Sequence, residues 1–332
     1  MSKLDTLAAA ASALLKQAEL SPAETAQRFD AAVDVGRWRK LVPFATVEEP
    51  AVAGESVRIG PDDVARATRR LAGDGYFCLE RAFESERIDK MRRIVEAVRA
   101  DGWPAVFSFV FDDFWTIARS PCVLALLEES LGAGCLQNSV IWTHWVPGAK
   151  GATGWPPHVD LSGMGNKFLS IWISLSEAAI DNGCMFLIPP GDMPREVVEA
   201  IDAKADLSYA SYSNLLHNVI ALPVPAGSLI GWRGDVLHWG GTNAGGNVPR
   251  VSFALEFRSR DEAFTKFERP MIDLRAALPP LGLRLYAIAK ALRHYPKFEP
   301  IVSRFQPLAE RLWEETAPAP EQARRPDEAG LA

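Results

Sequence analysis

A histidine and an aspartate stand two positions apart in the stretch GWPPHVDLSG, residues 154–163. Side chains of a β-strand alternate between its two faces, so His158 and Asp160 can point to the same side and occupy adjacent corners of a metal's coordination sphere. The triplet alone is weak support, because His-x-Asp arises by chance in many chains of this length. Taken by itself, it favours a capped loop with a surface histidine over a metal site.

A second histidine can complete a ligand set. His238 lies in GWRGDVLHWGGTN, at the end of a β-rich run and before a glycine turn, where it can sit beside the first pair. Two histidines and one carboxylate form the facial triad of non-haem Fe(II) oxygenases, which leaves positions open for a co-substrate and O2. The alternative is a core histidine stacked on Trp232 or Trp239.

An arginine and a serine follow on another β-rich run. Arg250 and Ser252 share one strand face in RVSFALEF. An arginine that points inward among apolar neighbours is costly unless it meets an anion, and a bound dicarboxylate would satisfy it through a bidentate pair with help from the Ser252 hydroxyl. The alternative places Arg250 at the outer edge of the strand, paired with a carboxylate.

The composition is that of a large globular protein with an acidic balance. The 332 residues are 48% hydrophobic and carry a formal net charge of -6. No Lys/Arg cluster opposes that charge, which disfavours a nucleic-acid partner. No apolar run reaches the roughly 18 residues of a membrane span. The first 20 residues read as an amphipathic helix and not as a signal peptide, because charged residues interrupt their apolar patch.

The four cysteines are far apart in the sequence and form no CxxC pair. This spacing indicates buried free thiols in a reducing compartment. We therefore expect a cytoplasmic protein with neither a nucleic-acid nor a membrane partner. The four residues are Cys78, Cys122, Cys135 and Cys184.

Helices are predicted at both ends of the chain. Ser21-Pro22-Ala23-Glu24 fits a capping box with proline in the first helical turn. The other expected helices cover residues 61–71, 85–99, 122–131, 281–292 and 301–315, with a strand at 76–79. The aromatic segment WPAVFSFVFDDFW, residues 103–115, is interpreted as a buried part of the fold more than as the cap of an apolar pocket.

From about Gln137 short β-rich runs replace the helical pattern. They are SVIWTHWV, FLSIWISLSEA, CMFLIPP, VIALPVP, SLIGW and RVSFALEF. Asp181-Asn182-Gly183 predicts a hairpin-type turn between two of these runs. Because no helical pattern separates most of the runs, we expect an antiparallel sandwich or barrel instead of a parallel α/β sheet.

An ordered set of segments resembles the phytanoyl-CoA dioxygenase family of Fe(II)/2-oxoglutarate-dependent oxygenases. The segments are HVD, SIWISL, DNGCMFLIPPG, GSLIGWRGDVLHWGGTN and RVSF, and LAGDGYFCLERAFESERIDKMRRIVEAV resembles the family's opening strand and helix. The likeness covers roughly residues 60–260. It implies an all-β core with flanking helices, folded as a cupin-like double-stranded β-helix (jelly roll), with Fe(II) as cofactor and with 2-oxoglutarate and O2 as co-substrates.

The residue patterns, together with this resemblance, predict a division of the chain. Residues 1–60 form an N-terminal helical extension, and residues 61–265 form the jelly-roll oxygenase domain. Residues 192–218 interrupt the β pattern as a lid or as a surface excursion. Residues 266–316 are C-terminal helices packed on the core, and the Pro/Ala-rich tail at 317–332 is predicted to be disordered.

By position, the resemblance implies roles for single residues. His158, Asp160 and His238 correspond to the iron ligands. Arg250 corresponds to the residue that holds the distal carboxylate of 2-oxoglutarate, with Ser252 close by.

Three further residues correspond to positions near the co-substrate. Trp172 corresponds to an aromatic residue beside 2-oxoglutarate. Family members often carry a basic or polar residue on the strand before the iron triplet, and here that strand reads IWTHWVPG. Thr143 or His144 is therefore the substitute, and a core or substrate-facing role for His144 is equally open.

The implied reaction is the oxidation of an unactivated C–H bond of a small molecule, with release of succinate and CO2. Acyl, amino-acid-like and specialised-metabolite substrates all fit, and hydroxylation, desaturation, ring formation and epimerisation are not separated. Asp160 disfavours halogenation, because related halogenases carry a small residue in its place. Two alternatives stay open: a cupin-like metal enzyme that does not use 2-oxoglutarate, and a non-catalytic metal- or ligand-binding sensor. The first of these would not need Arg250.

Overall fold

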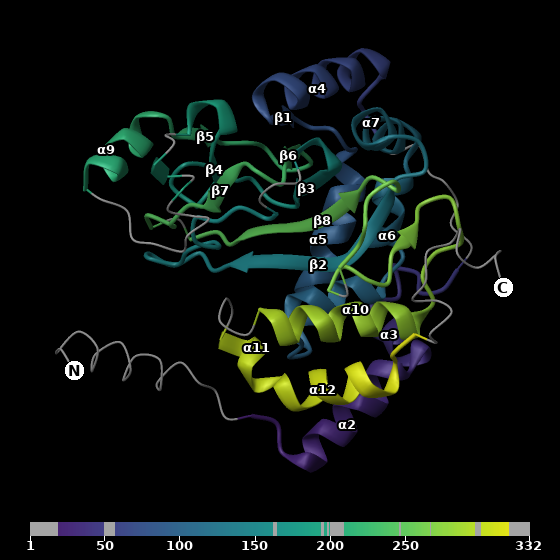
Figure 1. Ribbon diagram of the computed structural model, residues 1–332. Coiled ribbons are helices and arrows are strands. Elements are labelled where there is room, and N and C mark those ends of the chain that lie inside the picture. Colours follow the sequence, from purple (N-terminus) through teal and green to yellow (C-terminus); the bar gives the residue numbers. More distant parts are fainter. Residues whose placement is uncertain are drawn as a thin grey trace. The chain divides into compact units, whose positions relative to one another are not determined.

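The computed structural model describes residues 19–49, 57–161, 165–193, 196–197, 199, 209–245, 247–265, 267–295 and 300–318 (Figure 1). Contacts between Cα atoms divide the chain into two compact units. The β unit comprises Ala51–Arg93 and Thr116–Ala277, and the helical unit comprises Met1–Pro50, Ile94–Trp115 and Leu278–Ala332. The domain boundaries expected from the sequence stay a prediction.

Two antiparallel sheets form the β unit. The large sheet has the order β1 (Tyr76–Leu79), β6 (Leu229–Arg233), β3 (Phe168–Ser174), β8 (Arg250–Arg258), β2 (Leu136–Val146) and β9 (Ile272–Asp273). The small sheet has the order β5 (Ile220–Leu222), β4 (Met185–Ile188) and β7 (Leu237–Gly240). Isolated bridges from Thr153 to Thr242 and from His158 to His238 add a further segment to the side of β7 that β4 does not occupy. The expected jelly-roll fold is confirmed, although the two sheets do not close into a barrel within the described residues.

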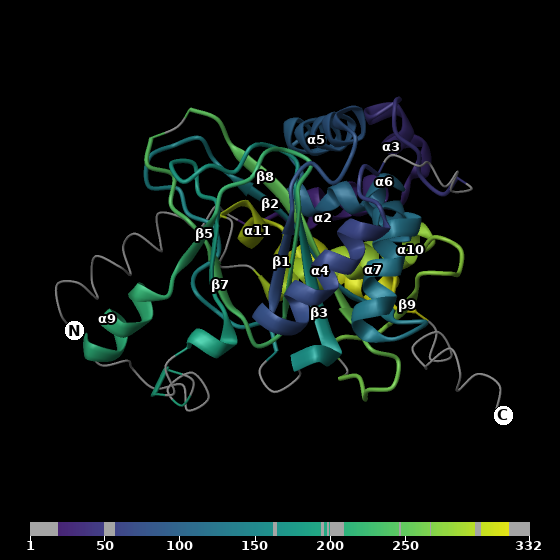
Figure 2. The ribbon, with the colours of Figure 1, turned by 90° about the horizontal axis from the view of Figure 1, so that it is seen from above.

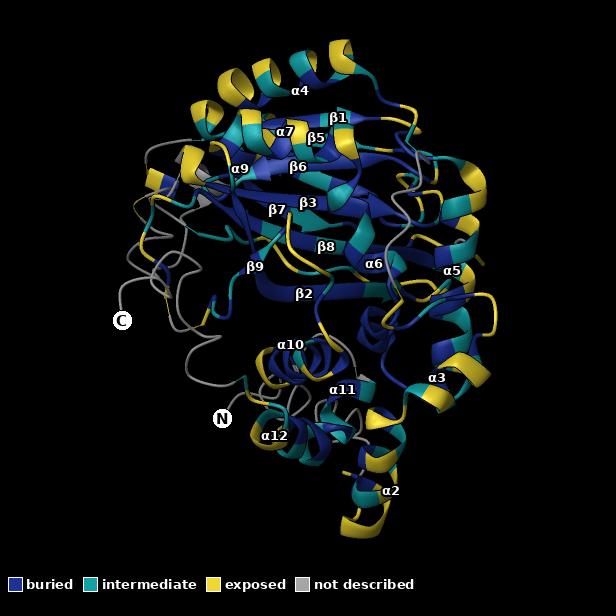
Figure 3. Ribbon diagram, turned by 90° about the vertical axis from the view of Figure 1, so that its right-hand side faces the viewer, coloured by how far each residue is buried: buried dark blue, intermediate teal, exposed yellow. Residues whose placement is uncertain are grey.

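Burial on both faces explains why the central strands read as apolar runs and do not alternate. Every residue of β3 is buried, between β6 on one side and β8 on the other (Figure 3). Its polar exceptions, Ser170 and Ser174, lie on the same face as Trp172, because side chains two residues apart in a strand share a face. That face is turned toward the small sheet, since Trp172 belongs to an apolar cluster with Met185 and Leu187 of β4.

Helices flank the large sheet. α4 (Pro61–Asp74) packs against α7 (Pro121–Leu131) and β1, and α7 lies beside β3 (Figure 2). Gly75 follows α4 in the left-handed region at φ 82°, which a residue with a side chain rarely adopts. The other elements of this unit are α9 (Tyr209–His217), η2 (Ile117–Arg119), η3 (Gly165–Lys167) and η4 (Pro190–Asp192).

α5 (Ser85–Ala100) begins in the β unit and ends in the helical unit. Its apolar side chains recur at helical spacing, and those that share one face are all buried. They are Ile88, Met91, Ile94, Val95 and Val98.

The helical unit is built around the aromatic segment at residues 103–115. Its helices are α2 (Pro22–Val33), α3 (Val35–Leu41), η1 (Ala105–Val110), α6 (Asp113–Thr116), α10 (Leu281–His294), α11 (Pro300–Arg304) and α12 (Gln306–Glu315). The Trp103 and Phe107 rings lie 4.5 Å apart between centroids, and the Trp38 ring stacks on Phe107 and packs at a tilt against Trp103. The expectation of a buried segment is confirmed. At the start of α2 the predicted capping box is present, since Ser21 and Glu24 bond each other's backbone N–H.

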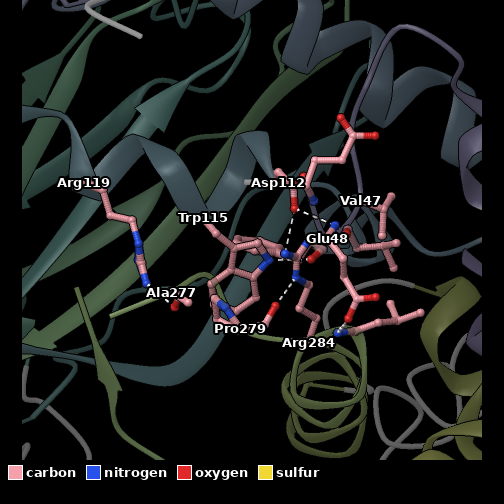
Figure 4. A network of polar contacts seen from close by, with 12 residues as sticks. Val47, Glu48, Asp112, Trp115, Arg119, Ala277, Pro279 and Arg284 are labelled. Atoms are coloured by element: carbon pink, nitrogen blue, oxygen red, sulfur yellow. Dashed lines mark hydrogen bonds and ion pairs between the residues drawn. The ribbon is translucent and has the colours of Figure 1, made fainter. Parts of the chain in front are cut away.

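A buried ion pair joins two segments of the helical unit (Figure 4). Arg284 Nη2 lies 2.7 Å from Asp112 Oδ1, and neither side chain is more than 5% exposed. Arg284 also donates to the main-chain oxygens of Pro279 and Val110, both at 2.7 Å. Asp112 accepts from the backbone N–H of Glu48 and of its neighbour. The network satisfies most of the polar atoms that the pair brings into the core.

Two expectations about local structure were wrong in detail. The turn at Asp181-Asn182-Gly183 exists, with Gly183 at φ 92°, but it does not join a hairpin, because β3 and β4 belong to different sheets. The helix expected at 301–315 is two helices, α11 and α12, separated at Phe305. Pro307 explains the break, because it has no N–H for the preceding turn and its ring clashes with it.

Several predictions fall outside the described residues. They are the amphipathic helix at the N-terminus up to residue 18, residues 194–195, 198 and 200–208 of the segment at 192–218, and all but two residues of the tail at 317–332. Among the described helices, none is long and apolar enough to cross a membrane.

Candidate metal centre

His158, Asp160 and His238 come together in the β unit. Each offers one donor atom, and these atoms all lie within 4.8 Å of one another. Both histidine Nε2 atoms are 3.5 Å from the same oxygen, Asp160 Oδ1. The three atoms therefore face a common point, as the ligands of one metal ion would.

The backbone of the small sheet sets the spacing of the two histidines. His158 and His238 exchange both main-chain hydrogen bonds of an antiparallel bridge, at 3.1 and 3.0 Å. Residues directly opposite each other in such a pair carry their side chains on the same face. Their ring centroids are accordingly 4.3 Å apart. Asp160 follows His158 by two residues and reaches the same point.

Hydrogen bonds select the tautomer of both histidines. His158 Nδ1 lies 2.8 Å from the carbonyl oxygen of Pro156, and His238 Nδ1 lies 3.0 Å from that of Val236. A carbonyl oxygen only accepts, so each Nδ1 carries the proton and donates it. Each Nε2 is thereby left with its lone pair toward the common point, which is the form that binds a metal.

The second oxygen of Asp160 is held by the large sheet. Ser170 Oγ donates to Asp160 Oδ2 at 2.6 Å, and Trp232 Nε1 donates to the same oxygen at 2.9 Å. The Trp232 ring also lies 4.4 Å from the His238 ring between centroids. The stacking of His238 on Trp232, weighed above as an alternative to metal binding, therefore occurs together with the ligand cluster.

Charge and burial prepare the cluster for a cation. Burial would raise the pKa of Asp160, but the nearby His238 and His158 and the hydrogen bond from Ser170 lower it below its ordinary value. Burial lowers the pKa of His238 to about 4, against the attraction of Asp160. Burial also acts on the more exposed His158, but there the hydrogen bond and charge of Asp160 outweigh it and raise the pKa. At neutral pH the cluster holds an ionised carboxylate beside a neutral His238.

Arg250 is buried on the same face of the large sheet. It is 1% exposed, and its Nη1 donates to Ser252 Oγ at 3.2 Å. Its Nε has no hydrogen-bond partner, and no ion pair joins it to a carboxylate within the described part of the chain. Burial lowers the pKa of Arg250 to about 10, which leaves it charged at neutral pH. The outer-edge alternative for Arg250 is therefore wrong.

A second donor without a partner lies next to this arginine. The guanidinium carbon of Arg250 is 5.7 Å from the centroid of the Trp172 ring. Trp172 is 1% exposed, and its Nε1 has no hydrogen-bond partner among the described residues. Two buried donors that no acceptor in the described part of the chain satisfies are costly, and an anion bound between them would remove that cost.

Glycines let the backbone approach the guanidinium. A Cβ on Gly154 would lie 2.7 Å from Arg250 Nη2 and 2.7 Å from the Cα of Gly240. A Cβ on Gly240 would lie 3.0 Å from the same Nη2. Only glycine at both positions leaves the guanidinium in its place.

Thr143 and His144 lie on opposite faces of β2. His144 pairs with Ser252 and shares its face, whereas Thr143 pairs with Phe253. Burial holds the pKa of His144 well below its ordinary value, and the positive charge of Arg250, together with that of the two cluster histidines when they are protonated, lowers it further. His144 is thus a neutral imidazole on the side of the sheet that carries the arginine.

Sequence reasoning missed the polar contacts of Ser170 and Trp232. Ser170 lies two residues before Trp172 in SIWISL, and this spacing puts both side chains on one face. Its contact with Asp160 depends on how the two sheets face each other, and no local pattern reports that.

Comparisons with known proteins give one family. Residues 109–252, which include every residue of the cluster as well as Arg250 and Ser252, match the model of the phytanoyl-CoA dioxygenase family. A comparison with curated proteins gives no match.

Several solved structures resemble this chain. The apo form of ThoJ, described as a non-haem monooxygenase, superposes with a TM-score of 0.50 at 17% identity over 75% of this chain and 99% of that one. EctD from S. alaskensis gives 0.47 at 18% identity over 70% and 95%. The α-ketoglutarate-dependent epimerase SnoN from nogalamycin biosynthesis gives 0.49 at 18% identity over 60% and 85%. At these identities the likeness concerns the fold only.

Proposed function

We propose that this chain, whose residues 109–252 match the model of the phytanoyl-CoA dioxygenase family, is a 2-oxoglutarate-dependent non-haem iron dioxygenase that oxidises a C–H bond of a small molecule at the cluster of His158, Asp160 and His238. The observation that carries the proposal is the convergence of three donor atoms within 4.8 Å. Two neutral imidazoles and one carboxylate are the donor set that non-haem Fe(II) oxygenases use. Bound Fe(II) would activate O2 with electrons from the oxidative decarboxylation of 2-oxoglutarate, which releases succinate and CO2.

Arg250 and Trp172 are proposed to hold 2-oxoglutarate. A charged guanidinium that is 1% exposed and meets no carboxylate of the described residues fits the distal carboxylate of a dicarboxylic acid. The indole Nε1–H of Trp172, which likewise has no acceptor among those residues, would donate to the same anion. Ser252 would act through its hydrogen bond to Arg250 Nη1, which limits the rotation of the guanidinium.

His144 is proposed as the polar residue that the family often carries on the strand before the iron triplet. It lies on the metal-facing side of β2, opposite Ser252, whereas Thr143 points to the other side. We therefore assign the contact with 2-oxoglutarate to His144 and not to Thr143. A neutral imidazole would serve as a hydrogen-bond donor to 2-oxoglutarate without adding charge beside the metal.

The substrate is proposed to be a small molecule of the acyl, amino-acid-like or specialised-metabolite class. SnoN, which shares the fold, is an epimerase from nogalamycin biosynthesis, and one of its structures holds α-ketoglutarate and a nogalamycin compound. A cupin-like enzyme that does not use 2-oxoglutarate is the second candidate. It is disfavoured because it would leave the buried charge of Arg250 without an anion.

Anaerobic addition of Fe(II) and then 2-oxoglutarate tests the proposal. We expect a weak metal-to-ligand charge-transfer band in the visible, and release of succinate when O2 and a substrate are supplied. The band should be lost in Asp160→Ala, which lacks a metal ligand. An iron-loaded wild-type protein that shows no band with 2-oxoglutarate would overturn the co-substrate assignment. Screening succinate release over candidate substrates then identifies the substrate class.

A further inference from the structure

The carboxylate of Asp160 is divided between two tasks. Its Oδ1 faces Nε2 of both His158 and His238, each at 3.5 Å. Its Oδ2 accepts from Ser170 Oγ at 2.6 Å and from Trp232 Nε1 at 2.9 Å. We propose that Ser170 and Trp232 are positioning residues that hold Asp160 as a ligand through Oδ1 alone, an inference that rests on the proposed function.

The two donors use the hydrogen-bonding capacity of Oδ2 in the plane of the carboxylate. A carboxylate oxygen has two lone-pair directions, and Oδ2 already accepts two hydrogen bonds from protein groups. Both bonds go to an ionised acceptor in the interior, where such bonds are short and strong. For Oδ2 to bind a metal, the carboxylate would have to give up at least one of them. Oδ1 is the oxygen left for the metal.

The sheet register makes both donors meet the same atom. Ser170 on β3 and Trp232 on β6 are direct cross-strand partners. Partners in an antiparallel pair carry their side chains on the same face, with Cβ atoms about 5 Å apart. A short hydroxyl and a long indole from adjacent positions can therefore converge on one oxygen that approaches from the opposite sheet.

Trp232 fixes a second ligand at the same time. Its ring lies 4.4 Å from the His238 ring at an interplanar angle of 41°. The imidazole of His238 is thus held by the Val236 carbonyl at Nδ1 and by the indole at its side. One side chain of the large sheet consequently fixes the orientation of two ligands from the other side of the β unit.

One-oxygen binding has a consequence for the chemistry. Carboxylates bind metals through one oxygen or through both. A carboxylate that bound through both would occupy a position that a facial triad leaves open for 2-oxoglutarate or O2. Ser170 and Trp232 keep that position open, although neither would touch the metal or the co-substrates.

The test measures Co(II) affinity and the ligand-field absorption of the Co(II)-loaded protein in Trp232→Phe and Ser170→Ala. Phenylalanine keeps a ring beside His238 and removes the N–H. Each variant should bind Co(II) about 10- to 100-fold more weakly than wild type. The absorption of the double variant should change in intensity, because a freed Oδ2 raises the coordination number. Ser170→Thr, which keeps the hydroxyl, should restore the affinity.

Two variants serve as matched controls. Trp239 neighbours His238 but lies on the other face of β7, where it stacks on Phe186 at 5.7 Å. Ser174 lies on the same face of β3 as Ser170, but its hydroxyl bonds to Pro225 and Ser228. Trp239→Phe and Ser174→Ala should bind Co(II) with the affinity and the spectrum of wild type.

The outcomes separate this inference from the proposed function. If wild type binds Co(II) and turns over 2-oxoglutarate, but both Asp160-facing variants bind Co(II) as wild type does, the positioning roles are overturned and the function stands. If wild type binds no metal, the proposed function itself has failed. Thermal unfolding of the metal-free variants identifies a folding defect. If Trp232→Phe shows a folding defect, the comparison of Ser170→Ala with Ser170→Thr still tests the positioning role.

Discussion

His158 and His238 face each other across a single antiparallel bridge, with main-chain N···O distances of 3.1 and 3.0 Å in the two directions. A shift of this pairing by one residue would carry one imidazole to the opposite face of the sheet. The ligand geometry therefore depends on the pairing of β7 with the segment before Asp160 as much as on the identity of the three side chains.

Metal binding should stabilise the protein through all three proposed ligands. At a metal concentration about 100 times the dissociation constant, a ligand that binds only the folded state adds about 2.7 kcal/mol to the free energy of unfolding. We expect this gain in the wild type and its loss in His158→Ala, Asp160→Ala and His238→Ala. Unfolding of each variant with metal and with chelator measures the gain. His294→Ala, which changes an exposed histidine outside the cluster, should keep it in full.

Arg250→Ala should weaken 2-oxoglutarate binding and leave metal binding intact. Truncating one partner of a buried charge pair costs about 2 kcal/mol or more, which is a rise of at least about 30-fold in the 2-oxoglutarate requirement. Titration of 2-oxoglutarate into the metal-loaded protein measures it. Arg260→Ala is the control: it removes an arginine that pairs with Asp273, and it should leave both 2-oxoglutarate binding and metal binding unchanged. Loss of metal binding in Arg250→Ala would instead assign the arginine a structural role.

Gly154→Ala should impair the same co-substrate site from the backbone side. The added Cβ would lie 2.7 Å from Arg250 Nη2 and from the Cα of Gly240, so the guanidinium and the loop must move apart. We expect a rise of about 10-fold in the apparent KM for 2-oxoglutarate, since strain of 1–2 kcal/mol is typical of overpacking. Gly191→Ala is the control, because its Cβ would meet nothing within 4 Å. An unchanged KM in Gly154→Ala would show that the guanidinium tolerates displacement.

The metal-free protein should lose stability on acidification through His238. Burial lowers the pKa of His238 from 6.5 to about 4, so between these values the unfolded chain binds a proton that the folded chain does not. Stability is then present above pH 6.5 and is lost as the pH falls toward 4, by about 3 kcal/mol at most. His158, whose pKa is raised, acts in the opposite direction, because its protonation favours the folded state as the pH falls. Urea unfolding of wild type and His238→Asn against pH isolates the loss, which should be absent in the variant.

Breaking the buried ion pair of the helical unit should strongly destabilise that unit. Asp112→Ala leaves the Arg284 guanidinium in the core without its counter-charge, which costs about 3–5 kcal/mol. Urea unfolding measures the cost. The exposed pair of Arg293 and Glu310 provides the control. Removing this pair should lower the free energy of unfolding by less than about 1 kcal/mol, as is typical of exposed ion pairs. If both changes lowered the free energy of unfolding equally, burial would not be the reason for the larger cost expected in Asp112→Ala.

Local patterns predicted the elements of the fold well. The capping box at Ser21, the strand at Tyr76–Leu79 and the buried face of α5 all follow from residue types at short spacing. The jelly roll follows from the succession of β-rich runs together with the family resemblance. The turn at Asp181-Asn182-Gly183 was also predicted, but its residue types cannot tell whether the strands that it joins pair with each other or cross between sheets.

The site was predictable where its residues are close in sequence or part of an ordered motif. His158 and Asp160 share a face through their spacing, and the structure brings His238 to them. The hydrogen bonds of Ser170 and Trp232 to Asp160 were not predictable, because they form across two sheets. Thr143 and His144 could not be separated before the register of β2 against β8 was known.

The support of Asp160 by the opposite sheet makes the metal centre sensitive to the spacing between the two sheets. The apolar cluster between them, which includes Ile230, Met185 and Leu187, determines how far Trp232 and Ser170 stand from the carboxylate. Substitutions in that cluster can therefore change how strongly iron is retained without altering any ligand. Over evolutionary time, the affinity for metal would be adjusted by residues whose only visible task is to fill space.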